Sequence, residues 1–184
     1  MIGLAAQQFL VAMKQAIHAF VLALGATVAL MLSPGASAGP ADDVQAAMQL
    51  LETKAAKLGT AVLKGDEAVA GKMVPALFFG DAKMNNSLSL VDEVQVEKGG
   101  TATIFVKSGD EFVRVATNVK KDDGSRAIGT ILDPKGRAIV AIAKGEPFFG
   151  EVDILGKPYV TGYKPIRDGS GSLIGIYYVG YLKN

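Results

Sequence analysis

The sequence predicts an α+β domain in which one long helix packs against a five- or six-stranded antiparallel sheet. Apolar residues recur at three- and four-residue spacing through residues 42–64, which is the pattern of an amphipathic helix. From residue 101 onward, β-branched and aromatic segments alternate with short turns rich in Gly, Asp and Pro. Short connections between successive strands favour antiparallel pairing.

The N-terminus has the order of features found in an export signal. Lys14 precedes an apolar run from Ala19 to Leu32, and Ala36–Ala38 supplies an A-x-A cleavage sequence. The run has about fourteen residues, whereas spanning a bilayer takes about twenty. We therefore expect a signal peptide over residues 1–38, cleaved after Ala38, and a periplasmic or secreted protein. An uncleaved membrane anchor is the alternative, since Ile2–Ala12 could lengthen the apolar run.

Residues 39–184 are expected to form a single domain, because a chain of this length can enclose one hydrophobic core. The chain has 19 Lys and Arg residues and 18 Asp and Glu residues, and Lys14 leaves with the signal. The remainder is close to neutral, so a nucleic-acid partner is not expected. The only histidine is His18, and cysteine is absent from the sequence. We accordingly expect no enzyme activity, no catalytic residues, no metal site and no cofactor.

Three helices are predicted before the strands begin. The helix over 42–64 buries a stripe that includes Val44, Met48 and Leu51, and Gly65 is expected to end it. A shorter helix is expected over 66–73. Residues 91–98 are ambiguous between helix and strand, and a helix ended by Gly99 is favoured.

The strand region is predicted to contain one helical insertion. Asp133-Pro134 has the residue types of a helix N-cap and first turn, and Gly145 is expected to follow the end of that helix. The predicted strands cover residues 101–107, 111–119, 126–132, 148–155, 159–166 and 173–181.

Several of these segments resemble the Cache 3/Cache 2 fusion family, whose members are single Cache sensor domains outside the membrane in bacterial chemoreceptors and histidine kinases. The resemblance covers residues 42–181, and its motifs lie within 101–107, 112–119, 126–130, 144–166 and 174–181. It implies a PAS-like sheet flanked by a long N-terminal helix. It also implies recognition of small molecules, often carboxylates, in a pocket over the sheet, with roles in signal transduction and chemotaxis.

In a chemoreceptor, the strand that contains Tyr178–Tyr181 would lead into a second transmembrane helix and a signalling module. This sequence runs only to Asn184. We therefore expect a sensor-type domain that binds a small organic anion and lacks its own transmitter. The alternative is an interaction protein whose 42–64 helix forms a homodimer or docks on a membrane receptor.

Arg114 is the leading candidate for contact with an anionic ligand. Strict alternation over 111–119 would place Arg114 and Asn118 on one face of the strand, opposite a β-branched core face. A guanidinium offers paired donors to a carboxylate and keeps its charge at any relevant pH. The alternative is an exposed arginine that pairs with an acidic neighbour such as Glu151 or Asp153.

Five further residues complete the predicted ligand-binding set. Arg126 opens a predicted strand, but it could equally be a solvated turn residue, and Thr130 could add a hydroxyl contact. Tyr159, Thr161 and Tyr163 share one face of a strand. Tyrosine rings with polar tips suit a small organic anion, although ordinary sheet packing explains them equally well.

Overall fold

The structure, a computed structural model, describes residues 39–183, and the predicted signal peptide lies outside these residues. Within the described part of the chain, no helix has the length and apolar character needed to cross a membrane. The elements, in chain order, are α2 (Pro40–Leu58), β1 (Ala61–Val69), β2 (Lys72–Phe79), β3 (Ala82–Lys83), α3 (Ser89–Lys98), β4 (Thr101–Ser108), β5 (Glu111–Thr117), α4 (Arg137–Ala143), β6 (Phe148–Ile154), β7 (Lys157–Arg167) and β8 (Leu173–Leu182).

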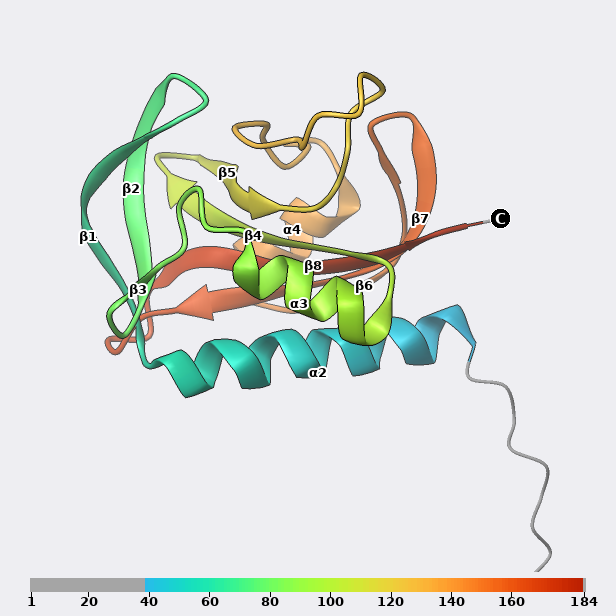
Figure 1. The fold of residues 1–184 in the computed structure, drawn as a ribbon, viewed down its shortest axis with the longest axis horizontal. Coiled ribbons are helices and arrows are strands. Elements are labelled where there is room, and N and C mark those ends of the chain that lie inside the picture. Colours follow the sequence, from blue (N-terminus) through green and yellow to red (C-terminus); the bar gives the residue numbers. More distant parts are fainter. Residues whose placement is uncertain (1–38, 184) are drawn as a thin grey trace, which may run out of the picture. The chain divides into compact units, whose positions relative to one another are not determined.

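The main sheet has five strands in the order β5-β4-β8-β7-β6, and every neighbouring pair is antiparallel. The predicted α+β fold, with its long N-terminal helix and PAS-like antiparallel sheet, is confirmed. Strands β5 and β6 are the two edges of this sheet. A second, three-stranded sheet in the order β1-β2-β3 follows α2 (Figure 1).

Helices α2 and α3 cover one face of the main sheet (Figure 1). The predicted apolar stripe of α2 is buried there, with Val44, Met48 and Leu51 at most 1% exposed. Each such side chain contributes about 1.5–3 kcal/mol by leaving water. Residues 91–98 lie within α3, so the helical interpretation of this ambiguous segment was the correct one.

The opposite face of the sheet carries a separate apolar cluster beneath α4. Phe105, Tyr163 and Tyr178 are fully buried in it, and Ala138 and Ile142 of α4 pack against it. The Tyr163 and Tyr178 rings are tilted with centroids 5.0 Å apart, which is a favourable aromatic arrangement. We call this side of the sheet the pocket face and the other side the helix face.

The helix prediction is wrong for residues 59–64 and 66–73. Helix α2 ends at Leu58 because the chain then passes close to Gly80: a Cβ on Gly59 would lie 2.7 Å from the Gly80 Cα. The segment 66–73, predicted as a helix, is part of the β1-β2 hairpin. Its turn is Ala70-Gly71, with φ angles of 49° and 82°, which are the positive values of a tight hairpin turn.

Two further boundaries differ from the prediction. The predicted strand over 126–132 does not form. Ile131 makes an isolated bridge to Val113 of β5, and Arg126 makes one to Lys120, because Gly129 has φ of 80° and breaks the extended path between them. The helix predicted to start at Asp133-Pro134 begins at Arg137, after a turn in which Asp133 Oδ1 accepts a hydrogen bond from the Lys135 N–H at 2.9 Å.

Candidate ligand-binding pocket

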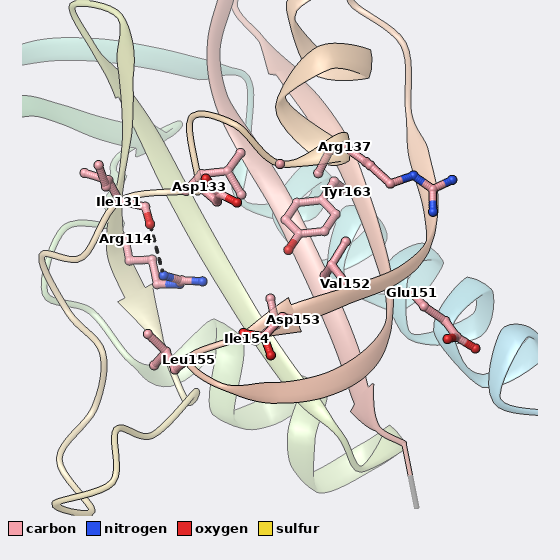
Figure 2. A pocket seen from close by; sticks show the side chains of 13 residues that line it. Arg114, Ile131, Asp133, Arg137, Glu151, Val152, Asp153, Ile154, Leu155 and Tyr163 are labelled. Atoms are coloured by element: carbon pink, nitrogen blue, oxygen red, sulfur yellow. Dashed lines mark hydrogen bonds between the residues drawn. The ribbon is translucent and has the colours of Figure 1, made fainter.

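A cavity of about 550 Å³ lies on the pocket face between the two edges of the sheet. It has the size typical of a small-molecule site. Arg114 comes from β5, Val152 and Ile154 come from β6, and Tyr163 comes from β7 (Figure 2). The remaining lining residues are Ile131, Leu132, Asp133, Gly136, Arg137, Ala138, Glu151, Asp153 and Leu155.

Arg114 is the buried cation of this cavity. Its side chain is only 4% exposed and extends over the Phe105 ring, with Cζ 4.9 Å from the ring centroid. Nη1 donates to Thr130 Oγ1 at 2.7 Å and to the Ile131 carbonyl at 3.4 Å. Nε is buried without a hydrogen-bond partner. Burial lowers the pKa of the guanidinium, while the neighbouring Tyr163 and Tyr178 oppose that shift.

Arg114 forms no salt bridge with any acidic residue in the described part of the chain. The alternative considered from the sequence, pairing with Glu151 or Asp153, is therefore not what the structure shows. Both residues line the same cavity, but Glu151 pairs with Lys183 at 2.8 Å. A buried, always-charged group is costly without a counter-charge.

Asn118 lies on the helix face, so its predicted shared face with Arg114 is wrong. The pairing of β4 with β5 passes from Ile104–Ala116 to Phe105–Arg114, which leaves Val115 as an extra residue. Such a bulge reverses the alternation beyond it. The Asn118 amide accepts from the Ala102 N–H at 2.7 Å and donates to the Val91 carbonyl at 2.8 Å.

Arg126 is held outside the cavity by an acidic partner on α3. It pairs with both carboxylate oxygens of Asp92, at 2.6 Å and 2.9 Å, and donates to the Thr117 carbonyl at 3.0 Å. Both side chains of the pair are partly exposed. The structure therefore does not bring Arg126 together with Arg114.

The three predicted residues of β7 share the pocket face but differ in their access to the cavity. Tyr163 lines it, and its hydroxyl points into the space toward Arg114 (Figure 2). Burial raises the pKa of Tyr163, so the phenol stays protonated and can donate a hydrogen bond. Thr161 is buried and donates to the Gly150 carbonyl at 2.8 Å. Tyr159 packs against the apolar cluster, and neither it nor Thr161 lines the cavity.

Most of the cavity lining was not predicted from the sequence. Asp133 was interpreted as a helix cap, and Glu151 and Asp153 were considered as possible partners of Arg114. The signal available was the resemblance of residues 144–166 to the family, but it does not tell which side chains of β6 face inward. Within the described residues, no cluster of His, Cys, Asp and Glu could hold a metal ion.

The fold and the cavity together define a PAS-like ligand-binding domain, with a helix-covered face and a pocket-bearing face on one antiparallel sheet. The model of the Cache 3/Cache 2 fusion domain matches residues 40–184, and the chain belongs to this family. Cache domains are extracytoplasmic domains that sense small molecules, and they are generally not enzymes. A comparison with curated proteins finds no match to the chain.

Proposed function

We propose that this chain is a periplasmic or secreted sensor-type domain that binds a small organic anion in the cavity on its pocket face. The observation that carries the proposal is Arg114, a buried guanidinium that lines the cavity, forms no ion pair with the described residues and keeps Nε without a hydrogen-bond partner. A ligand carboxylate would supply the missing counter-charge.

Thr130 and Tyr163 support this role in different ways. Nη1 of Arg114 donates to Thr130 Oγ1 at 2.7 Å and to the Ile131 carbonyl at 3.4 Å, which directs the guanidinium and leaves Nη2 for a ligand. Tyr163 lies across the cavity from Arg114 (Figure 2), so its hydroxyl could donate to the same anion. Of the seven residues predicted from the sequence, we retain Arg114 and Tyr163 as ligand contacts and Thr130 as a positioning residue.

The test is titration calorimetry of the purified domain with short organic acids, beginning with acetate, propionate, lactate, pyruvate and succinate. At least one acid should bind, and Arg114→Ala should abolish that binding. Arg126→Ala is the matched control, because it removes an arginine whose partners lie outside the cavity. Binding that survives Arg114→Ala, or is lost equally in Arg126→Ala, contradicts the proposed site.

We also propose that residues 1–38 act as an export signal. The support is the sequence order of Lys14, the apolar run and Ala36–Ala38. Intact mass measurement of the protein recovered from a periplasmic extract should give a chain that begins at Gly39. A full-length chain in the membrane fraction would indicate the uncleaved anchor instead.

Pairing through α2 is a second candidate function, favoured by the outer surface of this helix. Ala46, Gln49, Thr53 and Ala56 are exposed there and uncharged, so two copies could approach without charge repulsion. Sedimentation velocity should show a dimer that Gln49→Lys dissociates. A monomer at all concentrations would leave docking on a membrane receptor as the remaining version of this hypothesis.

A further inference from the structure

The open side of the cavity is lined by two apolar side chains that lie outside the protein core. Ile131 and Leu155 both line the cavity and are 37% and 41% exposed. Within the described residues, neither belongs to either of the apolar core clusters. In the view of Figure 2, they lie on opposite sides of the Arg114 side chain. Single exposed apolar residues are ordinary, so the backbone at Leu155 is the more informative feature.

Leu155 has a backbone conformation that leucine rarely adopts. Leu155 and Gly156 form the two-residue turn between β6 and β7, because Ile154 pairs with Lys157. Their φ angles are 54° and 84°, the positive values of a type I′ turn, which favours Asn-Gly, Asp-Gly or Gly-Gly. A leucine in the left-handed region is unfavourable. Such an outlier beside a cavity indicates a function for its side chain.

The other residues of this kind in the described part of the chain have an evident explanation. Besides glycines, Ala70 and Asn86 also have positive φ. Asn86 is a residue type that tolerates this region, and its amide donates to the Ala68 carbonyl at 3.1 Å. Ala70 carries only a methyl group. Leu155 thus combines the unfavourable φ with a large apolar side chain that the core does not use.

The interior of the cavity is apolar apart from Arg114 and Tyr163. Leu132, Ala138 and Ile154 are at most 6% exposed and continue the apolar wall. The other charged residues of the lining are all exposed to solvent: Asp133, Arg137, Glu151 and Asp153. Arg114, 4% exposed and with Nε unpartnered, is therefore the buried charge of this lining. The cavity thus offers a cation at its inner end and hydrocarbon from there to its open side.

We propose that the ligand is a monocarboxylate with a hydrocarbon chain, and that Ile131 and Leu155 determine this specificity. This inference rests on the proposed function and specifies its ligand class. The carboxylate pairs with the buried Arg114, and the chain extends toward the open side, where it covers Ile131 and Leu155. A cavity of about 550 Å³ holds ligands larger than acetate or pyruvate. A second polar group on the chain would lose water against the apolar wall, so dicarboxylates and hydroxy acids are disfavoured.

The experiment is titration calorimetry of the domain with the straight-chain acids from acetate to octanoate at neutral pH. Affinity should rise about threefold for each added CH₂ group, because each one leaves water on binding. Hexanoate should bind about tenfold more tightly than adipate, which has the same length but a second carboxylate. Arg114→Ala should abolish binding throughout the series.

Leu155→Asn tests the turn residue with two independent readouts. It should weaken octanoate binding about tenfold, since the chain loses an apolar contact, and leave acetate binding unchanged. It should also raise the thermal denaturation midpoint of the ligand-free protein by about 2 °C or more, because asparagine suits the positive φ. Leu182→Asn is the matched control: this leucine of β8 is 52% exposed and does not line the cavity. It should produce neither effect.

Ile131→Thr tests the other side of the opening. It keeps a β-branched side chain and the backbone carbonyl that accepts from Arg114 Nη1 at 3.4 Å. Octanoate binding should weaken about threefold or more, while acetate binding is unchanged. Val96→Thr is the control, because Val96 of α3 is 85% exposed and lies outside the cavity lining.

The outcomes separate this inference from the function on which it rests. Arg114-dependent binding whose affinity does not rise with chain length overturns the hydrocarbon ligand and leaves the anion site intact. Octanoate binding that is unchanged in both Leu155→Asn and Ile131→Thr overturns the assignment of these two residues. A midpoint that does not rise in Leu155→Asn shows that leucine serves the fold there, and overturns its role in specificity. Absence of Arg114-dependent binding of every acid overturns the inference and the proposed function together.

Discussion

Arg114 Nη1 donates to Thr130 Oγ1 at 2.7 Å, and this bond joins β5 to the irregular segment along its edge. Thr130 Oγ1 in turn donates to the Ala127 carbonyl at 2.8 Å. The main chains are joined at the same place, since the Arg114 N–H donates to the Thr130 carbonyl at 2.8 Å. The position of the guanidinium thus depends on a segment that is neither helix nor strand.

Thr130→Val should weaken anion binding about tenfold and reduce the free energy of unfolding by about 1–3 kcal/mol, because a buried donor loses its acceptor. Calorimetry and urea denaturation measure the two effects. Thr130→Ser retains the hydroxyl and should bind close to wild type. Equal affinities for Thr130→Val and wild type would show that Thr130 does not position Arg114.

Arg114→Met should abolish anion binding and raise the free energy of unfolding of the ligand-free protein by about 1 kcal/mol or more. The reason is that a buried charge without a counter-ion is replaced by an apolar chain of similar length. Urea denaturation without ligand measures this, and Arg114→Lys, which keeps the charge, should show no gain. A clear loss of stability in Arg114→Met would mean that the Phe105 and Thr130 contacts outweigh the cost of burial.

Asn118→Ala should lower the free energy of unfolding by about 1–3 kcal/mol, because the Ala102 N–H and the Val91 carbonyl lose their partner. Anion affinity should not change, since Asn118 lies on the helix face. Calorimetry of the folded variant decides this, and a fall in affinity would return Asn118 to the site.

Gly129→Ala should destabilise the protein more than Gly71→Ala. Both glycines have positive φ, 80° and 82°, so both substitutions incur a similar backbone cost. A Cβ on Gly71 meets open space, whereas a Cβ on Gly129 would lie 2.4 Å from the Ala70 Cβ. The difference between the two thermal denaturation midpoints reports the clash alone, and equal midpoints would mean that the β1-β2 turn moves aside freely.

Glu67 should contribute to the stability of the small sheet at neutral pH and lose this contribution in acid. The hydrogen bond from Lys83 at 2.9 Å is the main cause that lowers the Glu67 pKa from 4.5 in the folded protein. A lowered folded-state pKa stabilises above the unfolded value and is lost as pH falls through the folded one. Urea denaturation should therefore show wild type above Glu67→Gln at pH 7, with the gap closing below pH 4.5; a constant gap would contradict this.

The sequence predicted the elements whose residues obey one periodicity throughout. The apolar stripe of α2 can be predicted from the sequence because Val44, Met48 and Leu51 are all buried on a single face of the helix. Strand β1 has no such pattern: its burial does not alternate, and Gly65 lies where the β1-β2 register shifts. Residues 66–73 were therefore mistaken for a helix, since the hairpin depends on pairing with β2 and not on local composition.

The residues of the candidate site could be predicted only where the strand alternates regularly. Arg114 and Tyr163 lie on the expected face because each is read correctly by simple alternation within its strand. Asn118 is not, because the bulge at Val115 reverses the faces beyond it, and a bulge is set by the neighbouring strand. Asp133 and Asp153 could not be placed from the sequence, since the cavity depends on how the two sheet edges approach each other.

The strand order places Arg114 on β5 and Ile154 on β6, the two edge strands of the five-stranded sheet, and both residues line the cavity. A molecule that contacts both residues would connect the two edges of the sheet across its pocket face. Its binding would limit how far the two edge strands can move apart. A change in the curvature of the sheet on binding would also reach α2 and α3, which pack against its opposite face.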